Sequence, residues 1–281
     1  NIKEFSAIMD QYITNINLSS QATGLTGSEI LQIVDSTGGI LVPAHAFTPH
    51  KSFYGKCVPT YKDIFSEEEW EKVPAFELGL SADTQLADHL TELKDKTFLS
   101  NSDAHSLPKI AREYNLIKMD TLTFSGFKKA LIGSGESGVT GNYGLDPRLG
   151  KYHRSYCRDC DQSFAADKPI LTCPECDNDN LVVGVKDRLL KIGDRLENQN
   201  HSKRPSYIHQ VPLLDIPGIG AKTLEKLLKE FGTEMDIIHR TESQELKECV
   251  RDNVAEKIIK ARSGNINIKS GGGGNYGKVM G

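Results

Sequence analysis

The sequence has no uninterrupted stretch of about 18 apolar residues, which is the length a transmembrane helix needs. Its N-terminus also lacks a charged segment followed by an apolar stretch and a small-residue cleavage site. We therefore expect a soluble, cytoplasmic protein. The chain lacks strongly basic character as well, because its formal net charge is −4. This argues against a general nucleic-acid coat protein, whereas 281 residues with 38% apolar content can bury a sizeable core.

The charge is unevenly distributed along the chain. Residues 1–150 carry 13 basic and 19 acidic side chains, a net charge of −6, whereas residues 201–281 carry 13 basic and 10 acidic side chains, a net charge of +3. An acidic region suits metal ligands and a basic region suits phosphates, although ordinary surface variation gives asymmetries of this size.

Cysteine is scarce, and four of the six cysteines form two CxxC pairs. The pattern is C-x2-C-x12-C-x2-C, in which two tight turns bring four thiolates to one zinc ion. Four thiolates leave no open coordination position, so the predicted zinc is structural. The pattern comprises Cys157, Cys160, Cys173 and Cys176, and it leaves Cys57 and Cys249 outside.

A second set of metal-seeking side chains follows several apolar runs in the first half of the chain. A single buried histidine is more often a core residue than a ligand, but imidazoles and carboxylates that end neighbouring strands converge on one mouth of a barrel. Divalent ions held there activate water and clamp a phosphodiester. The predicted ligands are His45, Glu77, Asp103 and His105; His50 either binds metal or orients substrate phosphate. Asp103 and His105 are expected to face the same side of an extended segment.

Residues 1–132 alternate helical and strand-like patterns, which indicates an α/β fold with parallel strands. Apolar spacing predicts a first helix across residues 2–16, and Thr26 with Glu29 forms a capping-box signal for a second helix over residues 28–35. The other predicted elements are strands at 40–42, 73–78, 97–100 and 119–124 and helices at 84–93, 108–114 and 126–132.

Two glycine-rich segments predict boundaries. Residues 133–150 are interpreted as a connector that lacks the GK[ST] of a phosphate-binding loop, and residues 265–281 as a disordered tail. Between them we expect a zinc-binding element and linker at 151–200 and a helical domain at 201–264.

The segment LLDIPGIGAKTLEKLL resembles a helix-hairpin-helix element. Gly218 and Gly220 let the backbone turn with its amides exposed before the next helix, and amides at a helix start bind phosphate. Lys222 and Thr223 are predicted to assist, so these four residues are the candidate DNA contacts; a plain helical hairpin is the alternative.

Three motifs together resemble the endonuclease Q family of PHP-domain phosphoesterases: PAHAFTPHKSFYG, SNSDAH and GLDPRLGKYHRSYC. The resemblance covers nearly the whole chain. It implies a partial PHP-type distorted (β/α)7 barrel, a small zinc-ribbon-like element and an α-helical helix-hairpin-helix domain. It also implies an endonuclease dependent on Mg, Mn or Zn that nicks damaged duplex or single-stranded DNA 5′ to uracil, hypoxanthine or abasic sites.

The sequence departs from the PHP pattern at one point. PHP enzymes open with a His-x-His strand, whereas no histidine precedes His45. The N-terminal part of the domain and several ligands are therefore expected to be absent. A catalytically incomplete DNA-binding fragment is one alternative, and a PHP phosphatase acting on a small ester such as histidinol phosphate is another.

Overall fold

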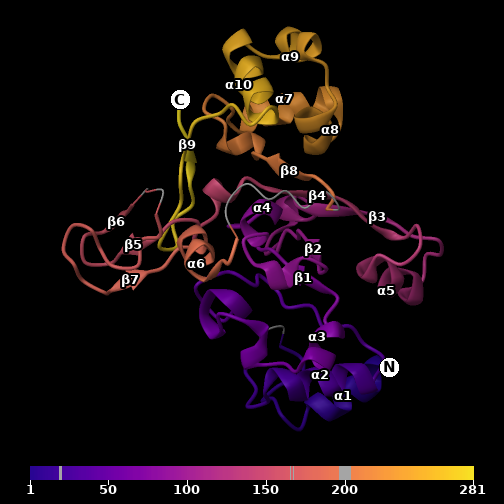
Figure 1. The fold of residues 1–281 in the computed structure, drawn as a ribbon. Coiled ribbons are helices and arrows are strands. Elements are labelled where there is room, and N and C mark those ends of the chain that lie inside the picture. The colour runs from indigo at the N-terminus through magenta and orange to yellow at the C-terminus, as the bar shows by residue number, and fades with distance from the viewer. Residues whose placement is uncertain (19–20, 165, 167, 196–203) are drawn as a thin grey trace.

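The computed structural model describes residues 1–18, 21–164, 166, 168–195 and 204–281. The predicted boundary between residues 200 and 201 lies outside these residues. Figure 1 shows a helical group, α7 to α10, at one end of the molecule and α1 to α3 at the other, with a mixed α/β region between them and a small β element to one side. The expected α/β class is confirmed. No helix in the described ranges is long and apolar enough to cross a membrane.

The two N-terminal helices are α1 (Ile2–Met9) and α2 (Gly27–Ser36). The predicted first helix is too long, because α1 ends at Met9 and buries none of its residues. The Thr26–Glu29 capping box is present at the start of α2, so that prediction is confirmed. Three short helices follow: the π-helix η1 (Phe53–Cys57), the 3-10 helix η2 (Tyr61–Asp63) and α3 (Glu67–Glu71).

One parallel strand pair forms the base on which the site is built. Strands β1 (Ala75–Glu77) and β2 (Thr97–Leu99) lie within two predicted strands and pair in parallel register. Helix α4 (Thr84–Ala87) and the 3-10 helix η3 (Thr91–Leu93) connect them. Phe76 and Phe98 belong to a buried aromatic-rich core that also contains Tyr54. The pair therefore has a rigid apolar base, and its two C-terminal ends meet at one edge.

The predicted strand at 40–42 and the predicted elements at 108–114 and 119–124 are wrong. Residues 40–42 are irregular, and the segment before β3 (Tyr114–Lys118) holds only the 3-10 helix η4 (Leu107–Lys109). Aromatic and branched side chains favour a strand at 114–118. Residues 120–123 are bends, and the Thr123 hydroxyl caps the following helix α5 (Phe124–Ile132) by accepting from the Gly126 amide at 3.1 Å.

The predicted glycine-rich connector contains the central strand of a sheet. Strand β4 (Gly138–Leu145) pairs antiparallel with β3 and parallel with β8 (Tyr207–Gln210). A Cβ atom on Gly144 would lie 1.9 Å from the Tyr207 hydroxyl oxygen, so glycine is needed where the tyrosine crosses the strand. Glycine here permits close packing, and the connector prediction for these residues is wrong.

The cysteine-rich region forms a small three-stranded element. Strand β5 (Tyr156–Cys157) lies between β6 (Gln162–Ser163) and β7 (Leu181–Val182). The 3-10 helix η5 (Pro147–Leu149) precedes the element, and α6 (Val185–Ile192) follows it. The buried Asp187 carboxylate accepts hydrogen bonds from the Ser155 and Ile170 amides at 2.8 and 3.2 Å, so α6 is fastened to the element.

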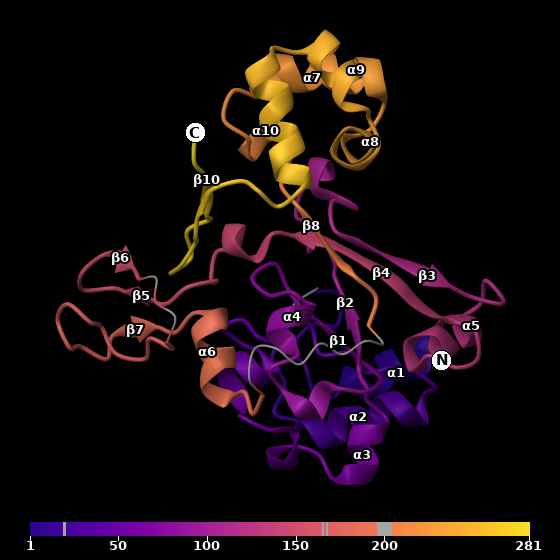
Figure 2. The same ribbon diagram turned by 45° about the horizontal axis from the view of Figure 1, so that its top comes forward.

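The predicted disordered tail is an ordered hairpin. Strands β9 (Ile268–Lys269) and β10 (Lys278–Val279) pair antiparallel, and Arg154 forms a bridge with Gly272 between them. Figures 1 and 2 both place this hairpin beside the β5–β7 element. A Cβ on Gly277 would lie 2.2 Å from the Arg148 carbonyl oxygen. The tail glycines are therefore required by packing, and the prediction of disorder is wrong.

The C-terminal helices enclose a separate apolar core that includes Leu213, Leu227, Ile237, Leu246 and Ile258. The elements are the 3-10 helix η6 (Leu213–Asp215), α7 (Ala221–Phe231), α8 (Glu234–His239), α9 (Ser243–Cys249) and α10 (Asp252–Arg262). The Arg262 guanidinium ties α10 to α8 by donating to the Ile238 and Ile237 carbonyl oxygens at 2.7 and 2.9 Å.

Candidate metal centres and nucleic-acid site

The four predicted cysteines form a compact cluster. Their sulfur atoms lie within 4.8 Å of one another. The Sγ–Sγ distances are 3.8 Å for Cys157 and Cys176 and 3.7 Å for Cys160 and Cys173. Four sulfurs about 2.3 Å from one zinc ion in a tetrahedron would be about 3.8 Å apart. The cluster therefore fits a metal ion such as zinc, with Cys57 distant and exposed.

The Glu77 carboxylate fixes the backbone around His45. The Ala46 amide donates to the Glu77 carbonyl oxygen at 2.9 Å, and the Glu77 amide donates to the Pro43 carbonyl oxygen at 3.0 Å. This holds the segment of His45 along β1. The Glu77 carboxylate accepts from the His45 amide and, at 2.7 Å, from the Gly79 amide. Burial raises the pKa of Glu77, although these amide bonds oppose the increase.

His45 and Asp103 both have left-handed backbone conformations. Their φ angles are 33° and 44°, values that side chains other than glycine adopt rarely. Asp103 is thus not in a regular extended segment as predicted; its carbonyl oxygen instead turns back to within 2.7 Å of the His105 Nδ1. Because a carbonyl oxygen only accepts, Nδ1 of His105 is the donor in this contact, and Nε2 is the ring nitrogen left to bind a metal. Strained backbone of this kind is concentrated at functional sites.

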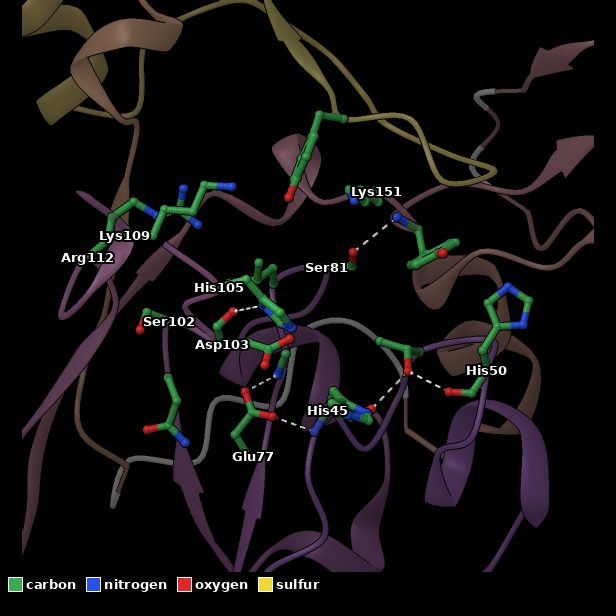
Figure 3. Close-up of a pocket in the computed structure, with 16 residues that line it drawn as sticks. His45, His50, Glu77, Ser81, Ser102, Asp103, His105, Lys109, Arg112 and Lys151 are labelled. Atoms are coloured by element: carbon green, nitrogen blue, oxygen red, sulfur yellow. Dashed lines mark hydrogen bonds between the residues drawn. The ribbon is translucent and has the colours of Figure 1, made fainter. Parts of the chain in front are cut away.

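All five predicted residues line one cavity of about 320 Å³ at the C-terminal ends of β1 and β2. In Figure 3, His45, Glu77, Asp103 and His105 surround its centre, whereas His50 lies to one side. The Nδ1 atom of His45 is buried without a hydrogen-bond partner. Across the described part of the chain, the ligand atoms of three or more such residues come within 4.8 Å only in the cysteine cluster. Metal binding by the five therefore stays a prediction.

Basic and aromatic side chains that the sequence analysis did not single out line the same cavity. Lys109 and Arg112 come from the segment before β3, and Lys151 precedes the cysteine cluster. Tyr276 reaches the cavity from the tail hairpin, with the Lys151 Nζ atom 4.7 Å from its ring centroid. The run GLDPRLGKYHRSYC marked the neighbourhood of Lys151, but no local signal marks Tyr276. The cavity thus combines potential metal ligands with cations suited to phosphate.

The four candidate DNA contacts lie at the start of α7, where two glycines form the turn after η6. Gly218 has a φ of 101°, and Gly220 is the N-cap of α7 without a side-chain cap. Gly218, Gly220 and Lys222 are exposed, and Thr223 is partly exposed. Uncapped amides at the first turn of an 11-residue helix are available to an anion. The binding role of this turn stays a prediction.

Comparisons with known proteins define the family. No protein-family model matches the chain. The chain is 43% identical over 279 residues to the uncharacterized protein YqxK of Bacillus subtilis, covering 99% of this chain and 70% of that protein. It is 35% identical over 274 residues to an uncharacterized protein of Methanocaldococcus jannaschii, covering 89% of this chain and 33% of the other.

Two crystal structures share the fold. One is the lesion-specific endonuclease PfuEndoQ of Pyrococcus furiosus, with a TM-score of 0.84, 32% identity and coverage of 99% of this chain and 72% of that one. The other is endonuclease Q in complex with a 27-mer duplex substrate that has an abasic lesion at the active site. Its TM-score is 0.85 at 31% identity, with coverage of 99% of this chain and 73% of that one. Identity and coverage at this level establish that the chain belongs to the endonuclease Q family.

Proposed function

We propose that this protein is a metal-dependent DNA repair endonuclease that hydrolyses a phosphodiester 5′ to a deaminated base, uracil or hypoxanthine, or to an abasic site. One observation carries the proposal: five potential metal-binding or phosphate-orienting side chains line a single cavity together with three cations. The similarity to a lesion-specific endonuclease and to a complex with an abasic duplex supports it.

The cavity residues are of types that bind a divalent Mg, Mn or Zn ion, although no three of their ligand atoms lie within 4.8 Å of one another in the structure. The buried Nδ1 of His45, which has no hydrogen-bond partner, and the Nε2 of His105 are the imidazole nitrogens that would bind the ion, and Asp103 adds a carboxylate. We assign these three residues and Glu77 to the metal. When bound, such an ion supplies Lewis-acid activation of water and stabilises charge on the phosphoryl oxygens.

The remaining side chains position the substrate. His50 orients the phosphate from one side of the cavity, where its ring packs edge-on against Tyr152 with centroids 5.2 Å apart. Lys109, Arg112 and Lys151 offset the charge of the phosphodiester on the other sides. The Glu77 carboxylate holds the His45 backbone, so its substitution would disturb the site through His45.

Two other regions support binding. Zinc held by the four cysteines stabilises the β5–β7 element, which has too few residues for an apolar core of its own. The amides at Gly218 and Gly220, with Lys222 and Thr223, would contact the DNA backbone as a helix-hairpin-helix, independently of sequence. We accordingly divide the chain into a catalytic α/β part, a zinc-binding element and a DNA-binding helical part.

A nicking assay tests the proposal. Duplex oligonucleotides with a single uracil, hypoxanthine or abasic site are incubated with Mg²⁺ or Mn²⁺ and with the parent chain, Asp103→Asn or Asp120→Asn. Asp120 is exposed and does not line the cavity, so it is the matched control. Cleavage 5′ to the lesion that only Asp103→Asn abolishes is the expected result; equal cleavage by Asp103→Asn would overturn the assignment.

The second candidate is a DNA-binding protein without catalysis. The observation that favours it is that the five cavity residues, all within the described ranges, do not bring three ligand atoms within 4.8 Å. Under this alternative, the parent chain binds duplex DNA with a steep salt dependence but leaves every lesion substrate intact.

A further inference from the structure

A second cavity, of about 440 Å³, adjoins the candidate active site. His50 lines both cavities, so they adjoin at that side chain. The second cavity separates the zinc-binding element from the α/β part. We call it the basic groove, and its lining includes Pro49, His50, Gly55, Lys56, Arg158, Leu171, Leu181, Val183, Arg188 and Lys191.

The basic groove is strongly cationic. Lys56, Arg158, Arg188 and Lys191 line it, and no aspartate or glutamate does. Lys56, Arg158 and Lys191 are exposed, and none of the three forms an ion pair with a residue in the described ranges. Cations gathered without neutralising partners repel one another and attract a polyanion.

The groove's cations come from separate elements that are fixed relative to each other. Lys56 lies in η1, Arg158 in the turn between Cys157 and Cys160, and Lys191 in α6. Arg188 fastens α6 to η1 by donating to the Tyr54 carbonyl oxygen at 2.9 Å. Asp187 fastens α6 to the zinc-binding element through the Ser155 and Ile170 amides. The groove is therefore preformed.

We propose that the basic groove binds the phosphodiester backbone of the DNA strand next to the nucleotide held in the candidate active site. This inference rests on the proposed function. A single small anion needs donors that converge on one point, whereas these cations are distributed over three elements of a groove that is also lined by His50. The apolar side chains of Leu171, Leu181 and Val183 offer contact surface for sugars. The zinc-binding element thus contributes Arg158 to the substrate path.

The test measures the salt dependence of DNA binding by the 281-residue chain. All proteins carry Asp103→Asn to preserve the substrate, a duplex with one uracil, and binding is followed by fluorescence anisotropy from low to moderate salt. The test variant adds Lys56→Ala, Arg158→Ala and Lys191→Ala. The control adds Lys3→Ala, Lys94→Ala and Lys129→Ala, which remove the same charge from exposed positions outside both cavities.

The association constant falls as salt rises, and each lost phosphate contact makes the slope of log K against log salt less steep by about 0.7–0.9. The three substitutions of the test variant should therefore make this slope less steep by about 2 or more. The control should retain the parent slope, and all melting temperatures should agree because every changed side chain is exposed. The proposal would be overturned if the test variant had the same slope as the Asp103→Asn parent, or if the test and control variants lost slope equally. It would also be overturned if the Asp103→Asn parent did not bind the duplex. A loss of slope in the test variant, together with no nicking of the same duplex by the chain with Asp103 intact, would contradict only the proposed endonuclease function.

Discussion

The cysteine cluster and the His–carboxylate cavity are both candidate metal centres, but they are assembled differently. The four cysteines lie within 20 consecutive positions and converge through two local turns. The cavity collects residues from position 45 to position 276, held by strand pairing, left-handed backbone conformations and a docked hairpin. A local site depends chiefly on its ligands, whereas a distributed site depends on the whole fold.

Removal of a cysteine ligand should have the largest effect. Cys176→Ser breaks the four-thiolate set, and zinc supplies folding free energy of about 10 kcal/mol or more in small zinc domains. We expect zinc content to fall sharply and the zinc-binding element to lose hydrogen-exchange protection. Cys57→Ser is the matched control, because Cys57 is equally exposed and outside the cluster. Equal zinc content in both variants, measured by elemental analysis, would contradict a local four-thiolate site.

Substitution in the distributed site should abolish chemistry without unfolding the chain. His105→Ala removes an exposed imidazole whose Nδ1 donates to the Asp103 carbonyl oxygen. We expect kcat/KM for nicking to fall by roughly 100-fold to 1,000-fold, the scale found when a preorganised catalytic group is lost. Zinc content should not change. Asn101→Ala is the matched control, because Asn101 is exposed and also lines the cavity. An equal loss of kcat/KM in both variants would show that the effect comes from disturbing the segment 101–105 and not from removing the imidazole.

Asp146, which caps the 3-10 helix η5 between β4 and the zinc-binding element, should contribute a pH-dependent increment of stability. Burial disfavours the Asp146 carboxylate, but Arg148 donates to it at 2.9 and 2.7 Å, and the net effect lowers the pKa of Asp146. Because folding lowers the pKa of Asp146, its carboxylate stabilises the folded protein at pH values above the usual carboxyl pKa. This stability is lost as the pH falls through the lowered pKa. Asp146→Asn should cost about 1–3 kcal/mol at neutral pH.

Urea unfolding at neutral and acidic pH measures this increment. The difference between Asp146→Asn and the parent should shrink as the solution is acidified, whereas exposed Asp120→Asn should match the parent throughout. A difference that stays constant with pH would show that the carboxylate charge of Asp146 is not the cause.

The smallest expected effect comes from the tail hairpin at the edge of the cavity. Tyr276 is 45% exposed and lies beside Lys151. Tyr276→Ala removes an aromatic surface whose stacking on a base is worth about 1 kcal/mol or more, so KM should rise roughly fivefold with little change in kcat. Tyr276→Phe should retain the parent KM. A fall in kcat alone would instead place the phenol in the chemical step.

Local sequence signals predicted the local features. The Thr26–Glu29 capping box, the β1 and β2 strands and the cysteine spacing all depend on residues close together in the chain, and each is present. The five cavity residues were identifiable because several follow apolar runs and resemble a family motif. Their metal-binding role is still a prediction, since proximity to one cavity does not establish coordination.

Long-range packing produced the errors. The glycine-rich sequence around Gly144 and Gly277 predicts flexibility, but these glycines leave room for the Tyr207 ring and the Arg148 carbonyl oxygen. Neither contact can be read from neighbouring residues. The same limitation hid Tyr276 and the basic groove, whose cations are distant in sequence and meet only when α6, η1 and the zinc-binding element are packed together.

The central claim is that the distributed cavity holds a divalent metal independently of the cysteine cluster. We would measure Mn²⁺ binding by electron paramagnetic resonance to the zinc-loaded 281-residue chain, comparing the parent with Asp103→Asn and Asp120→Asn. We expect the parent and Asp120→Asn to bind Mn²⁺ and Asp103→Asn to bind it much more weakly. The zinc content should be the same in all three proteins. Mn²⁺ binding that is absent from the parent, or that is equal in all three proteins, would contradict it.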